Sequence, residues 1–184
     1  LGFSSNSRDL MQFLKSQWFE EKFVIESGLF VSPTRDKFFG RVMFPIANTM
    51  GNTVAFTGRI LQNGEPKYLN SPASRIFDKS SILYGLHLAK QTIAKTTEVF
   101  IVEGQMDTIS LHQAGVTNAV GISGTALTQD HIRILKRFAK IIYLALDADG
   151  AGVKATFLSI ENLLNSDLEI RVILIPEWKD PDEF

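Results

Sequence analysis

The chain has 184 residues, of which 45% are hydrophobic and 21% charged, as expected for one globular domain or two small subdomains. Its 19 Lys and Arg against 20 Asp and Glu give a net charge of −1, so overall charge neither indicates nor excludes a nucleic-acid partner. With no cysteine and three scattered histidines, the chain offers no disulfide framework, no zinc-finger spacing and no thiol catalysis. The longest apolar run, 141–146, is too short to span a membrane, and no signal-like N-terminus is evident. We therefore expect a cytoplasmic protein with no membrane partner.

The first half of the chain predicts a small α+β subdomain. A serine-capped helix follows Ser7, and a second short amphipathic helix ends at Gly28. Residues 41–46 and 53–58 read as two strands of a hairpin, because apolar runs flank a segment rich in turn-forming residues. Residues 60–81 are rich in Asn, Gly, Pro and Ser and predict a long extended loop without regular structure, a kind of loop that is often functional.

From residue 98 the pattern alternates between strand and helix. Apolar runs predict strands at 99–102, 116–122, 141–146 and 170–175. Helical segments lie between them at 105–114, from Thr128 to 138, and at 153–164. The fold class is therefore α/β, a parallel sheet flanked by helices, preceded by the smaller α+β subdomain. We place the two domains at residues 1–95 and 96–184.

Acidic residues gather where a parallel sheet binds its ligands, at the carboxyl ends of its strands. Six acids follow three of the predicted strands: Glu103 and Asp107, Asp147 and Asp149, and Asp180 and Asp182. Carboxylates brought this close repel one another unless they are protonated or bridged by cations. Oxygen ligands without His or Cys favour Mg²⁺ or Mn²⁺, which bind few carboxylates and complete their shells with substrate phosphates. The pattern therefore predicts metal-dependent phosphoryl-transfer chemistry.

Simpler explanations exist for each acid taken alone. An Asp at the end of a strand is often a turn former or a helix cap, and residues 149–152 would make a capped turn into the next helix. The Asp-x-Asp-Gly segment at 147–150 is unlike an EF-hand loop, because a strand precedes it and the glycine is misplaced.

Three segments resemble the Toprim fold shared by primases, topoisomerases and some nucleases: Val102–Asp107, Ser123–Thr128 and Leu146–Gly152. The upstream segments are similar to the RNA-polymerase core of bacterial DnaG-type primases, over residues 41–46, 57–59, 66–72, 77–79 and 83–86. The Lys-Tyr-Leu-Asn-Ser-Pro block at 67–72 is highly specific. The similarity runs from about residue 7 to the end and implies part of a longer polymerase.

The resemblance implies roles for individual residues. Glu103 would act in catalysis as general base or metal ligand, and Asp147 and Asp149 would bind metal. The remaining acids of the same sheet edge, Asp107, Asp180 and Asp182, are expected to contribute to the metal site as well. The residues expected to contact nucleotide or nucleic acid are Arg59, Lys67, Tyr68, Asn70 and Lys79. Gln105 replaces a tyrosine usual in the family motif, a change we expect to be neutral.

The resemblance further implies the function of a nucleotidyltransferase that makes short RNA primers on single-stranded DNA during replication. Its expected partners are the DNA template, ribonucleoside triphosphates, the RNA primer and a replicative helicase that binds a region outside this chain. We expect a cleft with the basic residues on one wall and the acidic residues on the opposite wall. We also expect the protein to be associated with the nucleoid. Two alternatives remain at this point: a Toprim nuclease or topoisomerase, for which Tyr68, Tyr84 and Tyr143 are the only tyrosines, and a non-catalytic nucleic-acid-binding module.

Overall fold

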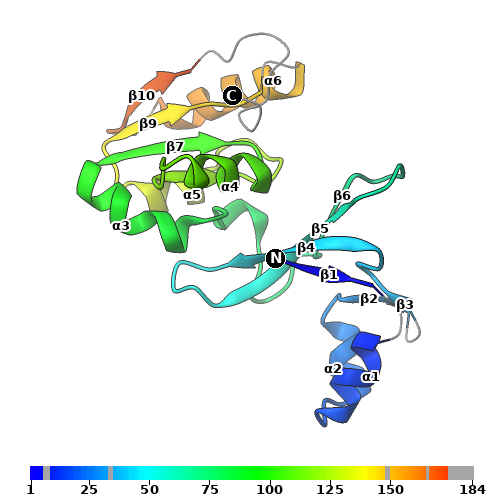
Figure 1. Cartoon of the computed structure of the whole chain (residues 1–184). Coiled ribbons are helices and arrows are strands. Elements are labelled where there is room, and N and C mark those ends of the chain that lie inside the picture. The colour runs from blue at the N-terminus through cyan, green and yellow to red at the C-terminus, as the bar shows by residue number, and fades with distance from the viewer. Residues whose placement is uncertain (6–8, 33–34, 148–149, 165, 174–184) are drawn as a thin grey trace. The chain divides into compact units, whose positions relative to one another are not determined.

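The computed structural model describes residues 1–5, 9–32, 35–147, 150–164 and 166–173. The chain divides into two compact units (Figure 1). The first unit comprises Leu1–Ile46 and Thr53–Phe77, and the second comprises Ala47–Asn52 and Asp78–Phe184. None of the helices in the described ranges is long and apolar enough to cross a membrane.

An antiparallel sheet forms the centre of the first unit. Its strand order is β1-β4-β5-β6, with β1 at Gly2–Ser4, β4 at Arg41–Ala47, β5 at Thr53–Ile60 and β6 at Tyr68–Asn70. The other elements are α1 (Asp9–Ser16), α2 (Glu21–Glu26), and a two-stranded sheet of β2 (Phe30–Ser32) and β3 (Arg35–Asp36). The two predicted helices and the hairpin are confirmed, while the predicted cap Ser7 lies outside the described residues.

The turn between β4 and β5 is closed by its own side chains. The Asn48 side-chain oxygen accepts hydrogen bonds from the backbone nitrogens of Met50 (3.0 Å) and Asn52 (3.1 Å). Gly51 has a φ of +93°, a backbone conformation that glycine adopts without steric cost. The Asn-rich turn therefore fixes how β4 leads into β5.

The prediction of an irregular loop over residues 60–81 is wrong at two places. Residues Tyr68–Asn70 form β6, whose Tyr68 and Asn70 pair with Arg59 and Thr57 of β5. Residues Lys79–Ser81 form the short 3₁₀ helix η1. The hydrogen bonds that define β6 come from its pairing with β5. Three residues are too few to show the alternating pattern by which a strand is recognised in a sequence.

The second unit contains the predicted parallel sheet. Its strand order is β10-β9-β7-β8, and every neighbouring pair is parallel. The strands are β7 (Glu98–Val102), β8 (Ala119–Gly121), β9 (Ile141–Leu144) and β10 (Glu169–Val172). Helices α4 (Gln105–Gln113), α5 (Gln129–Leu135) and α6 (Gly150–Leu163) connect them. The α/β class, the four strands and the three connecting helices are confirmed.

The core of this unit lies between the sheet and its helices. Alternate residues of the two central strands, Val99 and Ile101 of β7 and Ile142 and Leu144 of β9, have no exposed surface. An additional helix, α3 (Leu86–Thr96), also covers β7 and β8 and was not predicted. The central strands are therefore rigid supports for whatever follows their carboxyl ends.

Candidate functional site

Glu103 and Asp147 lie together at the carboxyl ends of β7 and β9. These strands are neighbours, and Ile101 pairs with Leu144, so the residues that follow each strand emerge side by side. Oε1 of Glu103 accepts a hydrogen bond from the backbone nitrogen of Asp147 at 3.2 Å. Both residues are half-buried. Two of the predicted acids are thus in contact at the edge formed by the carboxyl ends of the strands.

The first turn of α6 packs directly against this pair. A Cβ added to Gly152 would lie 2.3 Å from the Asp147 carbonyl oxygen and 2.6 Å from Oε1 of Glu103. Only glycine leaves room for so close an approach. Backbone N–H groups of a helix's first turn carry partial positive charge, which favours carboxylates placed beside them. The glycine therefore allows α6 to begin against the acidic pair.

Asp107 has a structural role in the first turn of α4, the helix that follows Glu103. Its Oδ2 accepts a hydrogen bond from the backbone nitrogen of Gly104 at 2.8 Å, and the residue is only 9% exposed. It therefore caps the start of α4. The other predicted acids, Asp149, Asp180 and Asp182, lie outside the described residues. Within the described ranges, no three His, Asp or Glu side chains come close enough to hold a metal together.

The loop between β8 and α5 closes over the turn that carries Glu103. The backbone nitrogen of Gly124 donates to the Glu103 carbonyl oxygen (3.3 Å), and the Gln105 side chain donates to Oγ of Ser123 (3.1 Å). Ser123 and Gly124 both have positive φ, +54° and +77°. Gln105, which stands where the family motif has a tyrosine, is thus a buried residue that tethers this loop.

In the first unit, β6 brings two of the predicted nucleotide-binding residues, Tyr68 and Asn70, beside β5, which carries a third, Arg59. Arg59 and Tyr68 are direct cross-strand partners, and the guanidinium carbon lies 5.6 Å from the centre of the tyrosine ring. The side chain of Thr57 donates to that of its partner Asn70 at 2.6 Å. The Arg59 charge is therefore placed over an aromatic face, and Asn70 is held within the sheet.

Arg41 is a residue of this unit that sequence reasoning missed. It is 7% exposed, and its Nη1 donates to the carbonyl oxygens of Gly58 (3.2 Å), Pro66 (2.9 Å) and Lys67 (3.3 Å). A Cβ on Gly58 would come within 3.0 Å of the Arg41 side chain, so the glycine makes room for it. Arg41 thereby fixes the backbone that presents Lys67. The sequence signal that could have identified Arg41 is an arginine at the start of an otherwise apolar strand.

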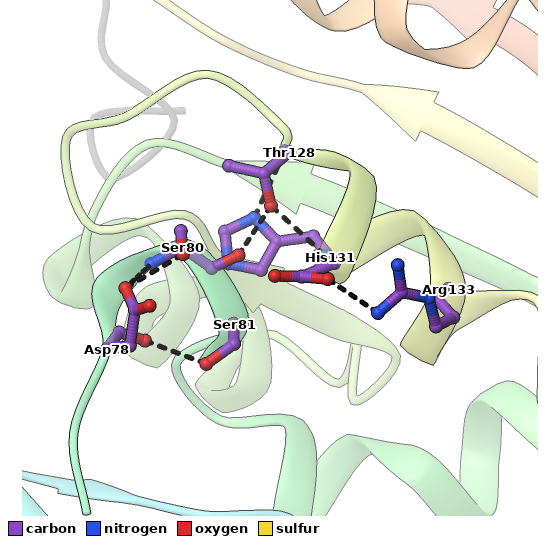
Figure 2. Close-up of polar contacts among 7 residues, drawn as sticks. Asp78, Ser80, Ser81, Thr128, His131 and Arg133 are labelled. Atoms are coloured by element: carbon purple, nitrogen blue, oxygen red, sulfur yellow. Dashed lines mark hydrogen bonds and ion pairs between the residues drawn. The ribbon is translucent and has the colours of Figure 1, made fainter. Parts of the chain in front are cut away.

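Lys79 differs from the other basic residues because it belongs to the second unit, with the acids. It opens η1, whose cap Asp78 accepts hydrogen bonds from the backbone nitrogen (2.9 Å) and the hydroxyl (2.8 Å) of Ser80. These hydrogen bonds lower the pKa of Asp78. Burial lowers the pKa of the half-buried Lys79 ammonium. The segment is held from the other side by His131 of α5 and by Thr128, the N-cap of that helix (Figure 2).

Two family models match the chain. The model of the N-terminal domain of the DNA primase catalytic core matches residues 1–90, and a Toprim-like model matches residues 100–184. A DNA primase of Clostridium acetobutylicum is 44% identical, with 100% of this chain and 31% of the relative covered. A DNA primase of Deinococcus radiodurans is 40% identical, with 98% and 33% covered. The chain therefore spans about a third of the length of these relatives.

Solved structures show the same likeness. A crystal structure of the zinc-binding and RNA polymerase domains of the Aquifex aeolicus primase has a TM-score of 0.92 and 38% identity, covering 100% of this chain and 46% of that one. The E. coli primase catalytic core has a TM-score of 0.89 and 35% identity, covering 99% and 61%. A DnaG primase catalytic domain bound to single-stranded DNA has a TM-score of 0.86 and 36% identity, covering 98% and 59%.

Proposed function

Since the chain belongs to the family of bacterial DnaG-type DNA primases, we propose that it forms part of a catalytic core that makes short RNA primers on single-stranded DNA. The observation that carries this proposal is the contact between Glu103 and Asp147 at the carboxyl ends of neighbouring parallel strands. Ligands of parallel α/β sheets bind at such an edge. The primer-making enzyme would act on the chromosome, so we place it at the nucleoid.

The proposed reaction is nucleotidyl transfer. The 3′-hydroxyl oxygen of one ribonucleotide attacks the α-phosphorus of a ribonucleoside triphosphate, which forms a new P–O bond. The bond from that phosphorus to the bridging oxygen breaks, pyrophosphate leaves with the electron pair, and the hydroxyl proton passes to a base. Glu103 is assigned to catalysis, as that base or as a metal ligand. Positioning and charge stabilisation supply most of the rate in phosphoryl transfer.

The acids fit a hard divalent cation, because they offer only carboxylate oxygens. Glu103, Asp147 and Asp149 would hold Mg²⁺ or Mn²⁺, with Asp107, Asp180 and Asp182 as further acids of the same edge. The bound cation would stabilise charge on the phosphate oxygens and lower the pKa of the attacking hydroxyl. Few protein ligands come together among the described residues, so we expect the triphosphate to complete the coordination shell.

The basic residues have a separate role in the proposal. Arg59, Lys67 and Lys79 would bind phosphate oxygens of nucleotide or nucleic acid, with Tyr68 and Asn70 beside them. Contacts to template would be mostly to the backbone, since a priming enzyme copies many sequences. The primase domain solved with single-stranded DNA supports a DNA template as partner. Ribonucleoside triphosphates, the RNA primer and a replicative helicase contacting a region outside this chain complete the proposed set of partners.

The alternatives predict different products from the same incubation. The full-length protein is mixed with single-stranded DNA, the four ribonucleoside triphosphates and Mg²⁺, and the products are separated by size. New short RNA is the expected product. Cleaved DNA without RNA would favour a nuclease or topoisomerase, and DNA that is bound but unchanged would favour a non-catalytic module.

A further inference from the structure

We propose that His131 is a positioning residue that fixes the backbone of Lys79, and through it the phosphate contact of that lysine. This inference rests on the proposed function, in which Lys79 binds a phosphate. His131 lies in the first turn of α5, 52 residues from Lys79 in the sequence, and its exposed fraction is 0%. No role in the proposed chemistry accounts for a histidine at this buried place.

The hydrogen bonds of His131 define its tautomer. Nδ1 lies 3.3 Å from the backbone nitrogen of Thr128, which can only donate, so Nδ1 is the acceptor. The hydrogen of the neutral ring is therefore on Nε2. Nε2 lies 3.0 Å from the carbonyl oxygen of Lys79 and donates to it. One nitrogen of the ring thus closes the cap of α5, and the other holds the backbone of Lys79.

A second hydrogen bond holds the next carbonyl. The hydroxyl of Thr128 donates to the carbonyl oxygen of Ser80, while it accepts from the backbone nitrogen of His131 at 3.1 Å. Figure 2 shows the threonine hydroxyl pointing at Ser80 with the imidazole directly beneath it. Two consecutive carbonyls of η1 are thus bound by the start of α5. Asp78 holds Ser80 from the opposite side, so the segment is restrained on both sides.

The burial of His131 favours its neutral form. Burial lowers its pKa, while the carbonyl oxygens of Lys79 and Ile82 and the carboxylates of Asp130 and Asp78 act in the opposite direction. A protonated ring would turn Nδ1 into a donor facing the Thr128 N–H, another donor. A buried aliphatic side chain would pack here without the desolvation cost of a ring with two polar atoms. What the imidazole supplies, and an aliphatic side chain would not, is a fixed donor for the carbonyl oxygen of Lys79.

The same cap connects Lys79 to the edge that carries Glu103. Thr128 ends the loop whose Gly124 donates to the Glu103 carbonyl oxygen. In that loop, Leu127 is held by α6 through Ser159 and Asn162, at 3.0 and 2.8 Å. Lys79 is therefore tied to the acidic edge within one compact unit. Its flexible side chain starts from a fixed backbone, which reduces the conformational freedom lost when it binds a phosphate.

Two amide variants separate the hydrogen bonds of His131. In the full-length protein, His131→Asn can accept from Thr128 but is one methylene too short to reach Lys79. His131→Gln can reach both partners, because its amide oxygen and nitrogen are spaced like the two ring nitrogens. We expect His131→Asn to weaken equilibrium ATP binding by about tenfold and to raise KM for ATP in primer synthesis by a similar factor. A tenfold change in affinity corresponds to the loss of about one well-placed hydrogen bond. His131→Gln should stay within about twofold of the wild type, and kcat should change little in either variant.

A double-mutant cycle shows whether His131 acts through Lys79. Lys79→Ala alone should weaken ATP binding, and adding His131→Asn to it should cause no further loss. The matched control is Asn118→Ala, which removes another buried side chain bonded to a backbone carbonyl, that of Glu98 at the amino end of the sheet. It should lower thermal stability without weakening ATP binding.

Several results would overturn the inference: equal ATP affinity in the Asn and Gln variants, additive losses in the cycle, or a similar loss in Asn118→Ala. Because ATP binding is measured at equilibrium, these outcomes hold whether or not primers form. A wild-type protein that binds ATP but makes no primers would contradict the proposed function alone.

Discussion

Glu103 and Asp147 are joined across two neighbouring strands, with Oε1 of Glu103 3.2 Å from the backbone nitrogen of Asp147. Through this hydrogen bond, the Glu103 carboxylate orders the backbone of Asp147. Gly152 completes the arrangement, because α6 passes so close to both residues that a side chain would not fit. The local geometry of this sheet edge therefore depends on a glycine, a residue without a functional side chain.

We expect Gly152→Ala to lower the free energy of unfolding by about 2 kcal/mol, since its Cβ would meet a backbone carbonyl that cannot move aside. Gly150→Ala is the matched control, because a Cβ there has nothing within 4 Å and alanine stabilises a helix relative to glycine. Urea unfolding of both variants is the measurement. Equal stability of the two would show that the first turn of α6 shifts freely.

Much of the second unit was predictable because its signals are local. Buried parallel strands are continuous apolar runs, and the acids that follow them indicate the sheet edge where we propose the functional site. The pairing of β9 with β7, which places Asp147 next to Glu103, follows from parallel topology. The helix α3 was not predicted, although its buried residues, Leu86, Ala89 and Ile93, have the i, i+3, i+7 spacing of one helix face. Leu88, an apolar residue off that face and 64% exposed, blurs the pattern.

The contacts that position side chains were not predictable for a different reason. Arg41 reaches carbonyls up to 26 residues away, and His131 reaches one 52 residues away. Both residues look like ordinary polar positions in the sequence, and only the tertiary fold supplies their partners. The strand β6 depends equally on a distant partner. Sequence patterns indicate candidate functional residues, whereas the residues that hold them in place become visible only in three dimensions.

Asp36 should give the first unit a measurable pH dependence. It is 3% exposed, and burial raises its pKa above 3.8, with the charge of Asp9 adding to the rise and the Leu10 backbone opposing it. An acid whose pKa is raised by folding binds its proton more tightly in the folded state. Its contribution to stability therefore increases as the pH falls through the raised pKa toward 3.8, and is lost at higher pH.

We expect the unfolding free energy of the wild type, relative to Asp36→Asn, to rise on acidification from about pH 7 to about pH 4. Taking the difference between the two proteins cancels the titration of groups common to both. Urea unfolding across this range is the measurement. A difference that is flat, or that falls with acidification, would contradict the raised pKa.

Lys67→Ala should weaken the binding of single-stranded DNA to the full-length protein and reduce its salt dependence. Loss of one phosphate contact lowers the slope of log K against log salt by about 0.7 for a single strand. Lys22→Ala, an exposed lysine of α2 in the same unit, is the control and should leave the slope unchanged. An unchanged slope for Lys67→Ala, together with lost Mn²⁺ affinity, would make Lys67 a structural residue.

Asp147→Asn should abolish the weak Mn²⁺ binding expected of the acidic edge, because the amide removes a charged oxygen ligand. The matched control is Asp167→Asn, which changes an exposed acid of the same unit that pairs with Lys136. Isothermal titration with Mn²⁺ alone measures the effect. An isotherm identical to that of the wild type would remove Asp147 from the metal ligands.

The most direct test of the central claim is primer synthesis on single-stranded DNA by full-length wild type, Asp147→Asn and Asp167→Asn, with labelled ribonucleoside triphosphates and Mg²⁺. We expect the wild type and Asp167→Asn to make short RNA at similar rates. The rate of Asp147→Asn should be at least about 100-fold lower, the scale of losing one group that stabilises transition-state charge. Primer synthesis by Asp147→Asn at the wild-type rate would contradict a catalytic role for the acidic edge.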